Sequence, residues 1–239
     1  MARLLVGLPQ LQGKLKNYAS RYDMVELRPV DEALPPPGRL KRWRADAPPG
    51  FAFSVVLPRV VASLEPGPAA DEALETTLRS AAALEARCIL LATPPSVRPT
   101  QRNRNRIVEL AHRLPETGVV LCWQPSGIWE IEDAAAVAHL ARLLLVLDGS
   151  RDPLPPGPIA YTRLKGLGES SQLGSTSLTR LADQLAGRRE CFVVVESGDA
   201  ARVKSSLLAL LEGRPMRAAG AVLFRPGQEP KLVGIDEEQ

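Results

Sequence analysis

The chain has 239 residues, of which 45% are hydrophobic and 24% are charged, and its net charge is +3 at pH 7. This length fits one large α/β domain with a sizeable core, which excludes a disordered chain. The mild positive charge falls well short of the clustered excess typical of a dedicated nucleic-acid-binding protein. The N-terminal apolar run is too short for a signal peptide, and no run reaches the ~18 residues of a membrane span, so we expect a cytoplasmic protein.

Short apolar runs alternate with longer amphipathic stretches along the chain. Most of the runs lack polar alternation, which is typical of parallel strands buried on both faces. We expect eight strands, at residues 3–7, 24–27, 52–57, 88–91, 119–122, 143–147, 159–164 and 192–195. We expect helices at residues 11–20, 37–46, 69–86, 101–113, 130–141, 176–187 and 199–212.

This alternation predicts the fold class. Eight strands separated by helices form the pattern of a single TIM-type (β/α)8 barrel. The proline-rich segment 148–158 cannot hold a regular helix, so we expect the sixth helix to be absent or degenerate. We expect residues 1–239 to form one domain, in which residues 218–239 are a short C-terminal extension.

The cysteines and histidines do not indicate a metal or cofactor site. Cys88, Cys122 and Cys191 each lie in or beside an apolar run, so we expect buried free thiols. His112 and His139 fall inside helical segments, and we expect neither a metal nor a cofactor. A Mg²⁺ ion held by carboxylates at strand ends is a minor alternative.

Polar residues at the carboxyl ends of the strands are the candidates for function, because these ends meet at the mouth of a barrel. Two of them, Glu26 and Asp148, are candidates for acid–base catalysis. Four others are candidates for ligand binding: Arg59, Tyr161, Arg163 and Lys165. The carboxylates and arginines could form a structural ion-pair network, or the arginines could bind an anionic ligand through bidentate hydrogen bonds.

An arginine-rich segment, residues 98–106, overlaps the start of the helix expected at residues 101–113. Arg98, Arg102 and Arg106 lie there, with the last two on one helical face. The segment could bind phosphate or nucleic acid at a helix start, or could be a solvated face. Trp123 and Trp129 flank a loop after the fifth strand and could form either an apolar plug or a stacking platform.

The ordered strand-end residues resemble the YecE-like family, a domain-of-unknown-function family with a TIM-barrel fold. The resemblance rests on segments spread over nearly the whole chain: Leu15–Leu27, Trp43–Ser54, Leu57-Pro58-Arg59, Pro94-Pro95, Pro125-Ser126, Asp148, Tyr161–Gly166 and Gly198–Ala201. It implies a barrel whose activity is not known.

The chain departs from the family pattern at several polar positions. The Gly-Thr-Ser-Gly-Trp segment after the first strand is missing, and Arg28 replaces an asparagine. Trp123 stands where the family carries an arginine, Lys165 replaces a histidine, and Glu196 and its neighbour replace an asparagine pair. The resemblance therefore implies a diverged member of the family.

Three functions follow from these residues. The first is binding of a small anionic or sugar-like ligand at the barrel mouth, without efficient catalysis. The second is an active enzyme on a phosphorylated or sugar-like substrate, with Glu26 or Asp148 as the acid or base. The third is association with nucleic acid through residues 98–106.

Overall fold

The computed structural model describes residues 3–28, 34–115, 118–165, 173–196 and 199–212. Within these residues the strands are β1 (Arg3–Leu8), β2 (Met24–Leu27), β3 (Ala52–Val56), β4 (Cys88–Ala92), β5 (Val120–Gln124), β6 (Leu144–Leu145), β7 (Ile159–Leu164) and β8 (Glu190–Val195). The helices are α1 (Leu15–Ala19), α2 (Pro37–Asp46), α3 (Arg59–Ala62), α4 (Pro68–Ala83), α5 (Gln101–His112), α6 (Ile131–Leu140), α7 (Ser175–Leu185) and α8 (Ala200–Glu212).

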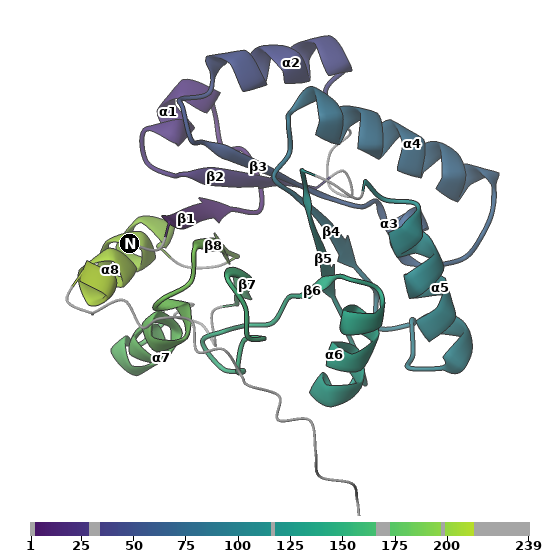
Figure 1. Cartoon of the computed structure of the whole chain (residues 1–239). Helices are drawn as coiled ribbons and strands as arrows, with labels where there is room; N and C mark the ends of the chain where they lie inside the picture. Colours follow the sequence, from purple (N-terminus) through teal and green to yellow (C-terminus); the bar gives the residue numbers. More distant parts are fainter. Residues whose placement is uncertain (1–2, 29–33, 116–117, 166–172, 197–198, 213–239) are drawn as a thin grey trace, which may run out of the picture.

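The eight strands form one parallel sheet that curls into a barrel with the helices outside (Figure 1). The strand order is β6-β5-β4-β3-β2-β1-β8-β7. A parallel bridge between Leu147 and Thr162 joins the two edges at β6 and β7. The predicted TIM-type (β/α)8 barrel is therefore confirmed.

The helices follow the prediction except in the connection from β3 to β4. Residues 146–158, between β6 and β7, contain no helix, so the predicted absence of the sixth helix is confirmed. The connection from β3 to β4 contains two helices, α3 and α4, where the sequence predicted one. Every helix among the described residues is too short or too polar to cross a bilayer.

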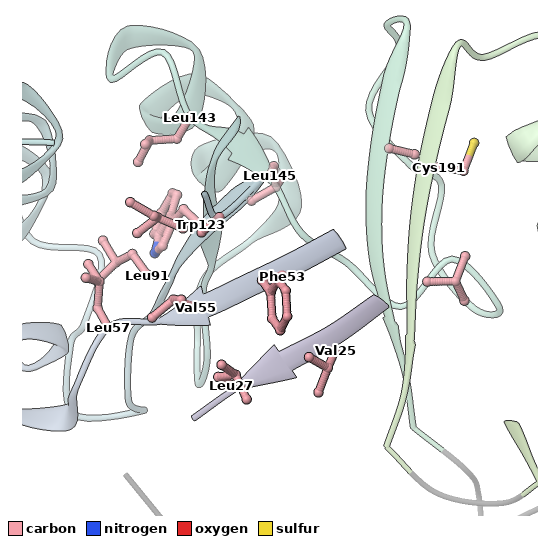
Figure 2. Close-up of a cluster of buried hydrophobic side chains, with 14 of the residues drawn as sticks. Val25, Leu27, Phe53, Val55, Leu57, Leu91, Trp123, Leu143, Leu145 and Cys191 are labelled. Atoms are coloured by element: carbon pink, nitrogen blue, oxygen red, sulfur yellow. The ribbon is translucent and has the colours of Figure 1, made fainter. Parts of the chain in front are cut away.

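Successive side chains along each strand point to opposite faces of the sheet, which divides the core into two layers. One set of side chains, including Met24, Cys88 and Phe192, fills the barrel interior. The neighbouring set, including Phe53, Leu91 and Trp123, packs towards the helices (Figure 2). Both strand faces are apolar because both are covered, which explains the unalternated runs of the sequence.

Some predicted boundaries were wrong. The first helix begins at Leu15 instead of residue 11. Gly13 has a positive φ (74°), which a right-handed helix cannot include, so the helix begins after it. Strand β6 is shorter than the predicted 143–147 and spans only Leu144–Leu145. All three cysteines are free and buried, as predicted. The expected C-terminal extension, residues 218–239, lies outside the described residues.

Candidate functional site

Three inward-facing side chains from three strands form a hydrogen-bonded chain inside the barrel. Glu26 on β2 is fully buried and accepts a hydrogen bond from the Tyr161 hydroxyl on β7, with 2.6 Å between oxygens. The hydroxyl of Ser54 on β3 lies 3.0 Å from the Tyr161 oxygen. Since Tyr161 donates its single proton to Glu26, Ser54 donates to Tyr161.

Arg163 lies two residues after Tyr161 on β7 and joins this chain to two further strands. Its Nη2 lies 3.1 Å from Oε1 of Glu26 and 3.1 Å from Oε1 of Glu196. Its Nη1 donates a hydrogen bond to the side-chain oxygen of Gln124 at the end of β5. One buried guanidinium therefore holds residues from opposite walls of the barrel in one cluster, which we call the mouth cluster: Glu26, Gln124, Tyr161, Arg163 and Glu196.

Burial dominates the electrostatics of Glu26. It raises the pKa of this carboxyl above the ordinary value, while Arg163, the Tyr161 hydrogen bond and Arg28 oppose the shift. Burial and the adjacent Glu26 also raise the pKa of Tyr161 far above its ordinary value. Tyr161 therefore remains protonated and donates a hydrogen bond at neutral pH.

Several polar atoms of the mouth cluster and the neighbouring Arg28 are buried and have no hydrogen-bond partner among the described residues. They are Oε1 of Glu26 and of Glu196, Nε and Nη2 of Arg163, and Nε of Arg28. The Arg163 contacts at 3.1 Å are thus ion pairs without good hydrogen-bond geometry. These atoms retain hydrogen-bonding capacity beyond their ion pairs, and a group that both donates and accepts hydrogen bonds matches it.

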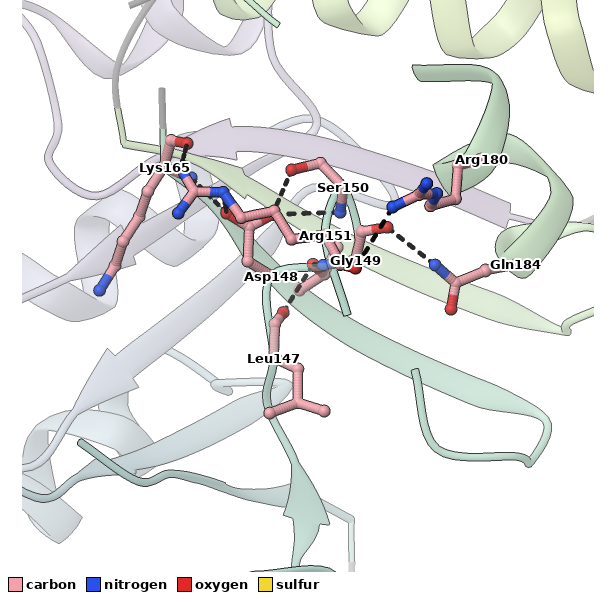
Figure 3. Close-up of polar contacts among 9 residues, drawn as sticks. Leu147, Asp148, Gly149, Ser150, Arg151, Lys165, Arg180 and Gln184 are labelled. Carbon is pink, nitrogen blue, oxygen red and sulfur yellow. Dashed lines mark hydrogen bonds and ion pairs between the residues drawn. The ribbon is translucent and has the colours of Figure 1, made fainter. Parts of the chain in front are cut away.

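Asp148 belongs to a loop instead of the mouth cluster. Its Oδ1 accepts hydrogen bonds from the backbone N–H (3.1 Å) and hydroxyl (2.6 Å) of Ser150. Its Oδ2 accepts a hydrogen bond from the backbone N–H of Lys165 (3.1 Å) and lies 3.6 Å from Nε of Arg151 (Figure 3). These contacts fix the connection between β6 and β7 in the place of the absent helix.

The remaining strand-end candidates are exposed. Arg59 begins α3, and its side chain makes no ion pair within the described residues. The Lys165 side chain is also exposed, and within the described residues its polar contacts are made by its backbone groups, with Asp148 and Arg151. Of the six predicted mouth residues, the structure joins Glu26, Tyr161 and Arg163 and leaves the other three outside the cluster.

The arginine-rich segment is partly neutralised. Arg106 pairs with Glu65 at 2.9 Å. Its neighbour Arg104 pairs with Asp133 at 2.8 Å and lies over the ring of Trp129. Arg98 and Arg102 are exposed on or before the first turn of α5. Among the described residues the segment therefore keeps two arginines without an ion-pair partner, Arg98 and Arg102, fewer than its sequence suggests.

The sequence places Arg28, Gln124 and Glu196 at strand ends, but we did not predict them as catalytic or ligand-binding residues, and Ser54 was missed altogether. The alternation of side chains along each strand could have identified the inward-facing residues, because it places Gln124 inside the barrel and Trp123 outside it. Trp123 is fully buried on the helix side, where its indole N–H donates to Thr93 (3.1 Å), so it is no stacking platform. No group of three or more metal-ligating residues occurs within the described ranges.

Comparisons with known proteins point to one family. The model of a family described as "Protein of unknown function DUF72" matches residues 6–218. A DUF72 family protein from Enterococcus faecalis has a similar solved structure, with a TM-score of 0.70, 16% identity, and coverage of 89% of this chain and 96% of that one. A DUF72 family protein from Thermotoga maritima matches with a TM-score of 0.64, 18% identity, and coverage of 88% and 99%.

A third similar structure comes from outside that family. It is a xylose isomerase domain containing protein from Salmonella typhimurium, with a TM-score of 0.60, 12% identity, and coverage of 87% of this chain and 95% of that one. At this level of identity the likeness shows a shared barrel fold. A search of the curated proteins finds no match.

Proposed function

We propose a binding function for this chain, which belongs to the DUF72, or YecE-like, family of proteins of unknown function. It binds a small sugar-like molecule at the carboxyl-end mouth of its barrel. The observation that carries the proposal is the set of buried, unpartnered donors and acceptors in the mouth cluster. We place this binding in the cytoplasm, the compartment that the sequence favours.

The chemistry of the mouth cluster favours hydroxyl groups. Carboxylate oxygens of Glu26 and Glu196 offer acceptors, and Arg163 offers donors, all within one small volume. A hydroxyl group both donates and accepts, so neighbouring hydroxyls of a sugar or polyol can satisfy both kinds of group. The polar mouth of a TIM barrel is also the usual place for a ligand.

The same cluster disfavours an anion bound directly by Arg163. Its guanidinium already faces two carboxylates and the side chain of Gln124. An anion placed there would be repelled by the carboxylates of Glu26 and Glu196. A neutral, hydroxyl-bearing portion of a ligand therefore fits this position better than a phosphate or carboxylate.

An enzymatic function is the second candidate, and one observation favours it. Glu26 has a raised pKa and a direct hydrogen bond to Tyr161, so it could transfer a proton to or from a bound ligand. Asp148 is a weaker candidate for this role, because hydrogen bonds to the loop occupy both of its oxygens. The departures from the family pattern favour binding over efficient catalysis.

Isothermal titration calorimetry with neutral monosaccharides and polyols tests the proposal. We expect at least one to bind the wild type and to bind Glu26→Gln and Glu196→Gln about tenfold more weakly, because each loses a charged acceptor. Arg113→Gln, which alters an exposed ion pair, is the matched control and should bind as the wild type does. Equal binding by the three variants would exclude the mouth cluster as the site.

A further inference from the structure

We propose that a side cavity next to the mouth binds an oxyanion, a phosphate or a carboxylate, carried by the same sugar-like ligand. The inference rests on the proposed function and specifies its ligand class as phosphorylated or acidic sugars. It depends on a cavity, on the charge of the cavity lining and on its position relative to the mouth cluster.

The side cavity has a volume of about 340 Å³ and lies between the segments that follow β1 and β2. It is lined by Pro9, Gln10, Leu11, Gly13, Leu27, Arg28, Leu34, Pro35, Arg39 and Trp43. A second cavity of about 730 Å³, between α1 and α2, shares Leu11, Gly13, Arg39 and Trp43 with it. Figure 1 shows α1 and α2 next to each other outside β1–β3. These volumes are in the range of small-molecule sites.

The charged side chains among the described lining residues are both positive. The lining contains two arginines, Arg28 and Arg39, and no Asp or Glu among its described residues. Neither guanidinium has an ion-pair partner within the described ranges, and Nε of Arg28 is buried without a hydrogen-bond partner. Two unpaired guanidiniums in one cavity can hold an oxyanion by charge-assisted, bidentate hydrogen bonds.

Trp43 orients one of these arginines. The guanidinium carbon of Arg39 lies 5.6 Å from the centre of the Trp43 ring, in a cation–π contact. Both residues project from α2, four positions apart, so the contact holds Arg39 along the helix face that lines the cavity. An arginine already held in place loses less entropy when it binds an anion.

Arg28 connects the side cavity to the mouth cluster. It follows Glu26 by two residues in extended chain, so their Cα atoms are about 6–7 Å apart. Its positive charge acts on Glu26, because it opposes the rise in the pKa of that carboxyl. The side cavity therefore lies next to the mouth cluster along β2, within the length of a phosphorylated or acidic sugar.

Calorimetric titration with matched pairs of compounds tests the inference. The probes are glucose, glucose 6-phosphate and gluconate, ribose and ribose 5-phosphate, and inorganic phosphate alone. We expect the charged member of at least one pair to bind about tenfold or more tightly than its neutral parent, with an advantage that falls as salt rises. Arg39→Gln should remove this advantage and leave the affinity for the neutral parent unchanged. Arg42→Gln removes an exposed charge of α2 that lines neither cavity, and it should change neither affinity.

The outcomes separate the inference from the proposed function. Neutral and charged sugars that bind equally well, or an Arg39→Gln variant that weakens both equally, would overturn the side cavity and leave the mouth site standing. Charged compounds, or phosphate alone, that bind through Arg39 with no effect of Glu26→Gln would support the side cavity and overturn the sugar-binding mouth. An absence of binding across all probes would overturn both.

Discussion

Glu26 and Arg163 form an ion pair across the inside of the barrel. Their strands, β2 and β7, are separated in the sheet by β1 and β8, so the 3.1 Å contact spans the interior. The two side chains are 0% and 3% exposed. Desolvation of two charges offsets much of their attraction, so the pair contributes little net stability while both partners are present. Removal of one partner has a much larger effect.

Replacement of Arg163 by methionine should therefore destabilise the protein strongly. The variant removes the buried guanidinium that pairs with the carboxylates of Glu26 and Glu196, and we expect a loss of about 3 kcal/mol or more in the free energy of unfolding. Urea denaturation at pH 7 measures this loss. A double variant, Glu26→Gln with Arg163→Met, should recover much of it. Arg113→Gln, in a half-exposed pair, should change stability by less than about 1 kcal/mol.

The pH dependence of stability should report the buried Glu26. Burial raises the folded-state pKa of this carboxyl above its ordinary value of 4.5, so the folded state binds the proton more tightly than the unfolded state. The stabilisation from this group is complete below about pH 4.5 and is lost as pH rises through the higher folded value. The free energy of unfolding of the wild type, relative to Glu26→Gln, should thus decrease from pH 4.5 towards neutrality. An increase over that range would contradict the shift.

The barrel could be predicted from the sequence because short local runs of apolar residues are enough to identify its strands. Runs such as residues 88–91 and 192–195 are apolar on both faces, which specifies buried parallel strands, and the proline-rich segment 148–158 excludes a helix. The extra helix α3 was missed because its four residues, Arg59–Ala62, carry no amphipathic repeat. The length of β6 depends on its pairing with β5, which is not local information.

The mouth cluster could be predicted only in part. Glu26, Tyr161 and Arg163 lie at predicted strand ends, and the inward alternation places them together. Asp148 lies at a strand end as well, yet its contacts are with Ser150, Arg151 and Lys165. A carboxylate can accept hydrogen bonds from nearby backbone N–H groups or pair with an arginine distant in sequence. Which of these it does depends on the tertiary structure, so the sequence alone does not predict it.

An Asp148→Asn substitution should affect stability more than ligand binding. It replaces one carboxylate oxygen with an NH₂ group, so either Ser150 or the N–H of Lys165 loses its acceptor. We expect a loss of about 1–2 kcal/mol in the free energy of unfolding, with unchanged affinity for a sugar that binds the wild type. Asp152→Asn is the control from the same loop, since its side chain makes no hydrogen bond or ion pair within the described residues. A large loss of affinity in Asp148→Asn at full folding would instead place Asp148 in the site.

The hydroxyl of Thr162 should hold the closing seam of the barrel. It accepts a hydrogen bond from the backbone N–H of Gly149 (2.9 Å) and donates one to the carbonyl of Leu147 (2.8 Å). Within the described residues, one parallel bridge, between Leu147 and Thr162, joins the strands at this seam. Thr162→Val keeps the side-chain shape but leaves a buried N–H unsatisfied, so we expect a loss of about 1–3 kcal/mol.

Hydrogen exchange distinguishes a local effect at this seam from a general loss of stability. In Thr162→Val the Gly149 amide should exchange faster by more than the global destabilisation accounts for, because the seam opens locally. The control is Thr77→Val on α4, whose hydroxyl donates to the carbonyl of Ala73 within the same helix (2.8 Å). That carbonyl retains its helical partner in the variant, so the Gly149 amide should exchange as in the wild type. Protection of Gly149 that stays unchanged in Thr162→Val would show that strand pairing alone closes the barrel.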